Sequence, residues 1–163
     1  MAPAWNKEDG SLNLQWNVLL HHNEHTHFDV LPTLIGNTGS FAVPDHGDNS
    51  WIELCLTATD SGGLNDQECI DLRPNTVILS FDTVPSRLKL TYDGVTHITP
   101  FKVVTNLNAV RELVVEPAQV CHTFVSWSDG GASSHQITVP ATEQTYVAVY
   151  QRSCSLKRLL EVE

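Results

Sequence analysis

The feature that most constrains the fold is a series of short runs in which apolar and polar residues alternate, separated by turn-forming residues. The runs from Leu14 to Leu20 and from Leu88 to Tyr92 are two clear examples. Successive side chains of a strand point to opposite faces, so a period of two is typical of a strand with one buried face. No segment shows a comparable helical period. The sequence therefore predicts an all-β fold.

Further strand-like runs follow at regular spacing, each bounded by Gly, Pro, Asn or Asp. Asp93-Gly94 is a dipeptide that suits a two-residue hairpin turn, and Gly62 lies in a longer turn between Trp51–Thr57 and Gln67–Leu72. Short strands at this spacing indicate antiparallel β-sandwiches rather than a parallel sheet with crossover helices. The remaining predicted strands are Thr76–Phe81, Val95–Ile98, Phe101–Thr105, Arg111–Glu116, His122–Trp127, His135–Val139 and Thr145–Tyr150.

The length of 163 residues is enough for one domain or for two small ones. A boundary is predicted at Arg73–Asn75, where one hairpin ends and a new alternating run begins. The first predicted domain, residues 5–73, is short for a seven-stranded sandwich, so it either lacks an N-terminal strand or packs against its neighbour. The second covers residues 76–150. Residues 151–163 are interpreted as a tail that either forms a short helical turn or is not native sequence.

The charge balance limits the classes of partner. The chain carries 19 acidic and 9 basic residues, a formal net charge of -10, and no basic residues clustered with aromatic ones. Such a surface is a poor match for nucleic acid or an anionic membrane. No apolar run approaches the about 18 to 20 residues that span a bilayer. From the charge and the lack of such a run we expect no membrane partner. The start, Met1–Trp5, has no basic region followed by an apolar one, so we expect no signal peptide in this sequence, although a trimmed or recombinant fragment would look the same.

The four cysteines bear on the compartment. A hairpin folded about Gly62 would set Cys55 opposite Cys69, at a cross-strand separation from which a disulfide can form. Two buried thiols fit the same pattern, so the sequence leaves the disulfide and the thiols open. Cys121 and Cys154 form a second candidate pair, but no pattern gives Cys154 a defined place.

The strongest local concentration of ligand chemistry is the run His21–His27, which reads HHNEHTH. In an extended segment His25 and His27 point to the same face about 7 Å apart, and a tight turn before His25 would bring His21 or His22 opposite them. Imidazole nitrogens are ligands that suit zinc and copper. The run therefore predicts a zinc or copper site in which three imidazoles meet one ion.

Other side chains are candidates to complete this site. His46 is a further candidate ligand, and the carboxylates of Glu24, Asp45 and Asp48 could orient an imidazole or act as a base. Zinc with three protein nitrogens keeps a position open for water, so one alternative is a small zinc-dependent hydrolase in which Glu24 or Asp45 assists that water. The other alternative is that the histidines hold no metal and titrate near their ordinary pKa of about 6.5.

A calcium site is a separate candidate. Asp60, Asn65 and Asp66 surround a Gly-Gly turn, and calcium takes carboxylate and carbonyl oxygens. Asp, Asn and Gly are also the residues from which ordinary turns are made, and the spacing does not match an EF-hand. The sequence leaves calcium at Asp60 and Asp66 open beside a plain turn.

The tryptophans are the candidate platforms for a sugar ring. Trp16 alternates in phase with other apolar residues of its run, and Trp51 and Trp127 also lie in strand patterns. Large apolar rings in such positions are usually buried. We therefore expect these three to be core residues and regard Trp5 as the least constrained.

Several segments carry a resemblance to known modules. In the first half, Asp9–Leu12, Trp16–Val18 and Leu56–Leu64 resemble PKD-like and related Ig-like modules of secreted bacterial proteins. In the second half, Val84–Leu90, Thr99–Phe101 and Phe124–Gly131, the last of which reads FVSWSDGG, are similar to a repeat near the C-terminus of secreted glucose/sorbosone dehydrogenase-like enzymes. Together these resemblances cover most of the chain.

The resemblance implies two tandem β-sandwich modules that are extracellular, noncatalytic and accessory to a secreted enzyme. It also implies a polysaccharide or the parent enzyme as partner. It supplies no cofactor, because sugar oxidation and its quinone belong to a catalytic domain that this sequence does not contain. We therefore expect an accessory or binding module with a histidine-cluster metal site; the alternatives are the zinc-dependent hydrolase and a pure spacer.

Overall fold

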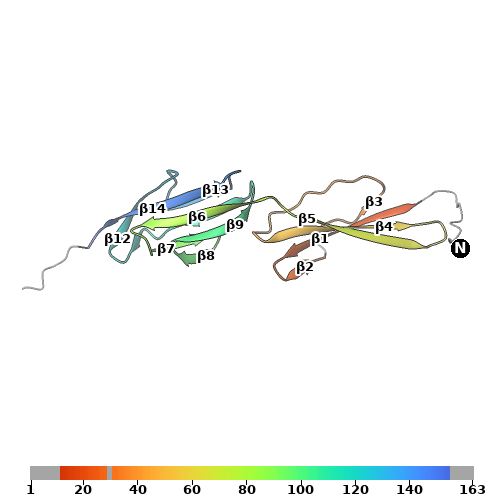
Figure 1. Ribbon diagram of the computed structural model, residues 1–163, viewed down its shortest axis with the longest axis horizontal. Coiled ribbons are helices and arrows are strands. Elements are labelled where there is room, and N and C mark those ends of the chain that lie inside the picture. The colour runs from red at the N-terminus through yellow and green to blue at the C-terminus, as the bar shows by residue number, and fades with distance from the viewer. Residues whose placement is uncertain (1–11, 29–30, 155–163) are drawn as a thin grey trace, which may run out of the picture. The chain divides into compact units, whose positions relative to one another are not determined.

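The computed structural model describes residues 12–28 and 31–154. These residues form strands and connecting segments but no helix, so the predicted all-β class is confirmed (Figure 1). They contain no helix that is long and apolar enough to cross a membrane. The chain divides into two compact units, Met1–Pro74 and Asn75–Glu163, which we call unit 1 and unit 2 and describe separately.

Unit 1 is built on one antiparallel sheet with β1 near its centre (Figure 1). One edge of β1 pairs with β4, and the other edge pairs with the short strands β2 and β3. β5 pairs with β4 and is exposed along its whole length. The strands are β1 (Asn13–His22), β2 (His25–His27), β3 (Leu34–Ile35), β4 (Ser50–Thr59) and β5 (Asn65–Leu72).

The β4–β5 hairpin has the register that the sequence predicts. Cys55 lies opposite Cys69, with a Cα–Cα distance of 4.0 Å, and the two form a disulfide. Gly63 in the connecting turn has a φ of 85°, a conformation that glycine adopts without steric cost. Of the two states that the sequence leaves open for this cysteine pair, the structure has the disulfide.

The hydrophobic core of unit 1 is small. Among the described residues its buried members are Val18, Leu20 and Ile52. They lie on one face of the sheet because they occupy alternate positions of paired strands. Leu31 and Phe41, from the chain between β2 and β4, pack partly against them. The described part of this unit has no second sheet, so irregular chain provides the cover.

Unit 2 contains two sheets. One has the strand order β13-β10-β7-β8 and the other the order β11-β12-β14-β6-β9 (Figure 1). The first four strands of the unit are β6 (Thr76–Val84), β7 (Lys89–Tyr92), β8 (Val95–Ile98) and β9 (Phe101–Asn106). The others are β10 (Val110–Val114), β11 (Ala118–Gln119), β12 (His122–Trp127), β13 (Ser134–Thr138) and β14 (Gln144–Arg152).

Both sheets of unit 2 contribute to a single core. Leu79 and Phe81 come from one sheet, Leu90 and Leu113 come from the other, and all four are at most 1% exposed. This arrangement is sandwich-like, because alternating side chains of the two inner faces meet between the sheets. The full set of buried residues is Val77, Leu79, Phe81, Leu88, Leu90, Tyr92, Leu113, Val115, Trp127, Ile137, Val139, Tyr146, Ala148 and Tyr150.

One pairing in unit 2 differs from the predicted antiparallel pattern. All the predicted strands of this unit are present, yet β14 pairs with β6 in parallel. Alternation shows which side chains are buried but not in which direction a distant strand runs, so the sequence did not predict this pair. A second disulfide joins Cys121 to Cys154, so the pair that the sequence could not place is also formed.

Candidate metal centre

The β1–β2 hairpin positions the histidine run. Asn23, with a φ of 53°, begins its two-residue turn, and His22 lies opposite His25. His27 lies two residues beyond His25, so these three imidazoles share one face of the sheet. The sequence left open whether His21 or His22 faces them, and the register shows that it is His22.

His46 joins these three from the chain between β3 and β4. Its Nε2 lies 3.0 Å from Nε2 of His27, and its ring centroid lies 4.5 Å from that of His27 and 5.0 Å from that of His22. His25 lies 4.9 Å from His27 and 5.4 Å from His22. Each ring therefore meets two others edge-on. We call His22, His25, His27 and His46 the histidine quartet.

The environment of the quartet favours neutral imidazoles. His22, His27 and His46 are half-buried, whereas His25 is exposed. Burial, followed by repulsion from His46 and His25 when these are charged, lowers the pKa of His27. A metal ion binds the neutral form of histidine. Because its pKa is lowered, His27 stays neutral, and able to bind a metal ion, down to a lower pH.

The ligand nitrogens of the quartet do not converge on one point. The closest pair is His27 and His46. In the described part of the chain, no three quartet residues have ligand nitrogens that all lie within 4.8 Å of one another. Nε2 of His22 lies 3.0 Å from the side-chain amide nitrogen of Asn23. Coordination of one ion by all four side chains would therefore require rotation of the His22 and His25 side chains.

His21 lies on the opposite face of the sheet. Its ring stacks on Trp51 with centroids 4.9 Å apart and planes 7° apart. Its Nε2 lies 2.8 Å from Oε2 of Glu53, and its Nδ1 lies 3.0 Å from Oγ1 of Thr26. Both ring nitrogens have partners on this face. His21, which the sequence included among the candidate ligands, is therefore not brought to the quartet.

The predicted carboxylates have different surroundings. Glu24 is exposed in the hairpin turn. Oδ1 of Asp45 accepts a hydrogen bond from the backbone N–H of Gly47, 3.2 Å away, while Asp48 is half-buried. Beside the histidine run, Glu53 lies against an imidazole; the sequence did not suggest it, and its partner is His21. The cross-strand register of β1 and β4 was the signal that could have identified it.

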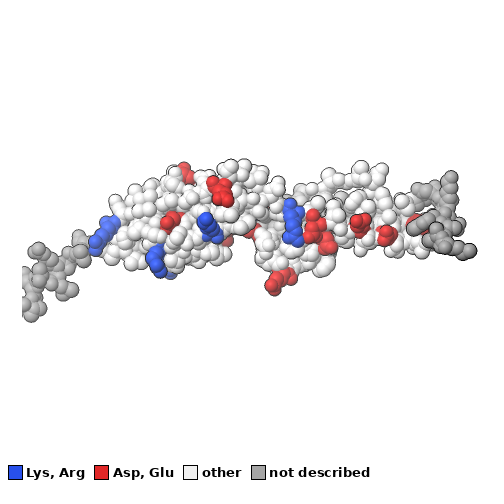
Figure 2. All heavy atoms as spheres, in the orientation of Figure 1, with Lys and Arg blue, Asp and Glu red and all other residues white. Residues whose placement is uncertain are grey.

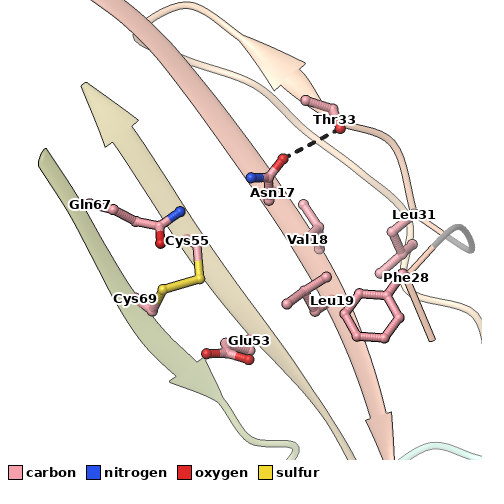
Figure 3. Close-up of a pocket in the computed structure, with 10 residues that line it drawn as sticks. All are labelled: Asn17, Val18, Leu19, Phe28, Leu31, Thr33, Glu53, Cys55, Gln67 and Cys69. Carbon is pink, nitrogen blue, oxygen red and sulfur yellow. Dashed lines mark hydrogen bonds between the residues drawn. A yellow bond between two sulfur atoms is a disulfide. The ribbon is translucent and has the colours of Figure 1, made fainter. Parts of the chain in front are cut away.

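A pocket of about 480 Å³ lies on the face that bears the disulfide. Figure 3 shows the Cys55–Cys69 bond and Gln67 on one side of it, and Phe28 and Leu31 on the other. A side-chain hydrogen bond of 3.5 Å joins Thr33 to Asn17 beside it. The lining residues are Asn17, Val18, Leu19, Phe28, Leu31, Thr33, Glu53, Cys55, Gln67 and Cys69.

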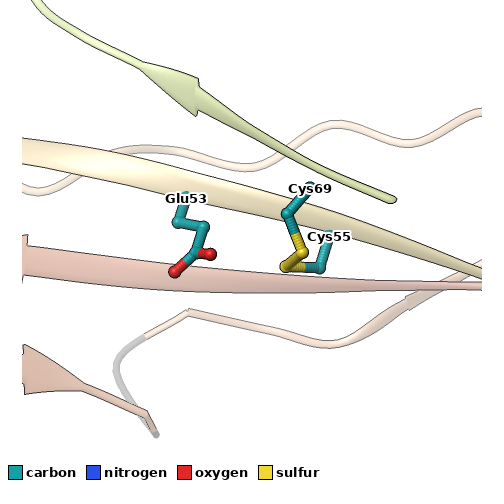
Figure 4. Close-up of side chains that lie close together, drawn as sticks. All are labelled: Glu53, Cys55 and Cys69. Atoms are coloured by element: carbon teal, nitrogen blue, oxygen red, sulfur yellow. A yellow bond between two sulfur atoms is a disulfide. The ribbon is translucent and has the colours of Figure 1, made fainter. Parts of the chain in front are cut away.

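One carboxylate lies close to the disulfide in this pocket. A carboxylate oxygen of Glu53 and the sulfurs of Cys55 and Cys69 all lie within 4.8 Å of one another (Figure 4). Metals bind cysteine as the thiolate. Because these sulfurs are bonded to each other, the group offers no thiolate, and we do not interpret it as a metal site.

The acidic turn of β4–β5 uses its carboxylates locally. Oδ1 of Asp60 accepts a hydrogen bond from the backbone N–H of Leu64, 2.8 Å away. Oδ1 of Asp66 accepts one from the N–H of Gln67, at 3.0 Å. These bonds are ordinary turn contacts. Calcium at Asp60 and Asp66 stays a prediction that this geometry does not test.

The tryptophans of the described residues are engaged with the protein itself. Trp127 is 3% exposed. Trp51 is half-buried, stacks on His21 and lies 4.5 Å below the guanidinium of Arg73. Trp16 Nε1 donates a hydrogen bond of 2.8 Å to the backbone carbonyl of Gly36. Trp5 lies outside the described residues. We therefore base no sugar-binding proposal on these rings.

Charged side chains are distributed unevenly by sign. In the face drawn in Figure 2, Asp and Glu are spread over both units, and Lys and Arg stand singly. This distribution agrees with the formal net charge of -10. The expectation that nucleic acid and membranes are not partners stays a prediction, which rests on this charge.

Comparisons with known proteins give no further guidance. No protein-family model, no curated protein and no solved structure matches this chain. The resemblance to PKD-like and Ig-like modules and the tandem-module interpretation therefore stay predictions. The functional proposal rests on the geometry of the histidine quartet.

Proposed function

We propose that this protein is a noncatalytic metal-binding module whose histidine quartet binds one zinc or copper ion. The observation that carries the proposal is the closed set of ring contacts, with the Nε2 atoms of His27 and His46 3.0 Å apart. Two ligand nitrogens bound to one zinc at about 2.0 to 2.1 Å are separated by a similar distance. The pair thus supplies two ligands of one ion.

The protonation of the quartet supports the same proposal. Protonated imidazoles at these separations repel one another, and the pKa of His27 is lowered by burial and by this repulsion. A neutral imidazole has one nitrogen lone pair, which a bound cation can accept.

The ligand type indicates which metals fit. Imidazole suits zinc and copper, whereas calcium and magnesium prefer carboxylate and carbonyl oxygens. Zinc would take the four nitrogens as a tetrahedron, and copper(II) would take them closer to a plane. The required side-chain rotations at His22 and His25 differ for these two geometries, so spectroscopy of the bound ion will identify the arrangement.

The number of ligands supports a noncatalytic role. Catalytic zinc sites have three protein ligands and keep one position for water, whereas structural sites are closed by four. The quartet offers four imidazoles and therefore fits a closed site.

An extracellular location is also part of the proposal. Both cysteine pairs form disulfides, Cys55–Cys69 and Cys121–Cys154. Disulfides persist in oxidising compartments and are rare in the reducing cytosol. The resemblance to accessory modules of secreted bacterial proteins points in the same direction.

Metal analysis and titration calorimetry of the untagged full chain test the proposal. We expect one zinc or copper ion per chain, and His27→Ala should weaken binding by at least about tenfold, because even partners of ligands contribute that much. His21→Ala is the matched control, since His21 lies one residue from the quartet on the opposite face. It should leave the affinity within about threefold of the parent.

Two outcomes would contradict the proposal. Absence of binding by the untagged chain would remove the metal site, and equal losses for the two variants would show that the quartet is not the binding site. Assays of the zinc-loaded chain on ester, phosphoester and lactam panels address catalysis. Turnover that disappears in His27→Ala would replace the noncatalytic module with a hydrolase.

A further inference from the structure

We infer that the bound ion has a structural task, which is to fasten the irregular segment Gly36–Asn49 across the sheet of unit 1. The inference rests on the proposed metal site and assigns that site a role. The segment connects β3 to β4 and contains no helix or strand.

The two ends of this segment are attached to unit 1 by hydrogen bonds. At its start, the N–H of Gly36 donates to the carbonyl of Leu14 at 2.9 Å, and Trp16 Nε1 donates to the carbonyl of Gly36 at 2.8 Å. At its end, Asn49 donates from its side-chain amide to Oδ1 of Asn23 at 3.0 Å, and the N–H of Asn23 donates to the carbonyl of Asn49 at 3.2 Å. Within the span, the carbonyl of Gly47 accepts a hydrogen bond of 3.0 Å from Oγ of Ser50, the first residue of β4.

Phe41 and His46 are side chains of the span that contact the rest of unit 1. Phe41 packs partly against the core of Val18, Leu20 and Ile52. His46 contacts the rings of the hairpin. Phe41 is needed as cover because the described core of this unit has three buried members and lacks a second sheet. The ordering of irregular chain costs conformational entropy, which contacts of this kind have to offset.

Coordination by the quartet would add a fixed link at this point. His22 is on β1, His25 and His27 are on β2, and His46 is on the segment. An ion bound by all of them connects three parts of the chain and joins Phe41 to a fixed neighbour five residues away. Since the unfolded chain has no preformed site, the binding energy stabilises the closed arrangement.

His46 is the ligand that makes this link. The other three imidazoles lie on the hairpin, and only His46 of the quartet extends the coordination to the segment. The structure therefore separates two effects of mutation. Loss of His25 should reduce only the affinity for the metal ion. Loss of His46 should reduce this affinity and also release the segment from the metal.

Limited proteolysis by chymotrypsin tests this role, because Phe41 is its preferred type of cleavage site and lies in the middle of the segment. The full chain is digested with EDTA and with saturating zinc, and cleavage after Phe41 is followed by mass spectrometry. We expect zinc to slow this cleavage at least tenfold and to leave cleavage rates in unit 2 unchanged, which also controls for effects of zinc on the protease. Hydrogen exchange of peptides within the segment should show the same protection.

The two variants provide the discriminating comparison, each at a zinc concentration that saturates it by calorimetry. His25→Ala should retain the protection at Phe41, and His46→Ala should lose it. Exchange protection of β4 in each variant confirms that unit 1 is folded, and only folded variants are compared.

The possible failures can be told apart. If zinc does not bind, the proposed function and this inference both fail. If zinc binds but cleavage after Phe41 is unchanged, the metal site stands and its structural task is overturned. Equal loss of protection in the two variants at saturation would also overturn it, because the segment would then not be held through His46.

Discussion

Unit 2 and unit 1 are both built mainly of antiparallel strands, but they bury their apolar side chains in different ways. Unit 2 places two sheets around fourteen buried apolar residues. Unit 1 has one sheet in its described part, with a core cluster of three buried residues and a cover of irregular chain. Burial of apolar area is the main favourable term in folding. We therefore expect unit 2 to be stabilised mainly by its core.

The difference suggests that unit 1 depends on cross-links. Its described part contains the Cys55–Cys69 disulfide between β4 and the exposed β5, and a histidine quartet that joins three segments. Small cores in other proteins are supplemented by disulfides and metals in the same way. Four experiments test this difference between the two units, and they are given in order of decreasing expected effect.

Truncation of the two cores should have the largest effect. Leu113→Ala in unit 2 removes a side chain with 0% exposure that lies between two sheets, and should lower the free energy of unfolding by about 2 to 5 kcal/mol. Leu20→Ala in unit 1 should cost less, towards 2 kcal/mol, because irregular chain beside it can relax into the space. Urea denaturation with hydrogen exchange read separately for each unit measures both. Equal costs would contradict the proposed difference between the cores.

Removal of the unit 1 disulfide should come next. The paired change Cys55→Ala and Cys69→Ala opens a loop with a sequence separation of 14, and should destabilise unit 1 by about 3 kcal/mol. Calorimetric unfolding of the full chain is the measurement. The control is Cys121→Ala with Cys154→Ala, which should leave unit 1 unchanged. If unit 1 is equally stable without Cys55–Cys69, it does not depend on that cross-link.

A close contact in unit 2 tests how tightly its sandwich is packed. A Cβ added at Gly131 would lie 2.5 Å from the ring of His135, which also lies 3.0 Å from the carboxylate of Asp129. Gly131→Ala should therefore cost about 1 to 3 kcal/mol. Urea denaturation should show that His135→Ala removes most of this cost in the double variant. Additive costs would mean that the ring is not the obstacle.

The smallest expected effect is the pH dependence of metal-free unit 1. Burial and then the neighbouring His46 and His25 lower the pKa of His27 in the folded state, so the unfolded chain takes up a proton more readily. Stability should be fully present above the ordinary pKa of about 6.5 and should fall as the pH falls below it. Thermal unfolding in EDTA between pH 7.5 and pH 5 measures this trend. His27→Asn should flatten it, and a trend that survives the change would assign it to other groups.

Much of the fold could be predicted from local pattern. Alternation located most strands of both units, although it did not predict the two-residue strands β3 and β11. The Gly62 turn set the register that places Cys55 opposite Cys69. The direction of β14 relative to β6 could not be predicted in this way, because a period of two carries no information on strand direction. The pairing of Cys121 with Cys154 could not be predicted from the sequence either, because it depends on where the last strand ends in space.

The candidate site was only partly predictable. The spacing of His25 and His27 placed both on one face, and the tight turn brought a third imidazole opposite them. The choice of His22 over His21 needed the register, which a one-residue shift would reverse. His46 was one candidate among several, because the segment that carries it has no periodicity from which its direction could be read.

The sequence by itself determined the class of fold, the faces of the strands and the clustering of histidines on one hairpin. These features depend on neighbours in the chain, whose geometry is set by backbone sterics and turn chemistry. Only the tertiary structure decided that His46 meets His27 and that His21 turns away to Trp51 and Glu53. Contacts of this kind depend on the path of the chain between distant residues. That path is set by many small packing energies, which cannot be read from a local sequence pattern.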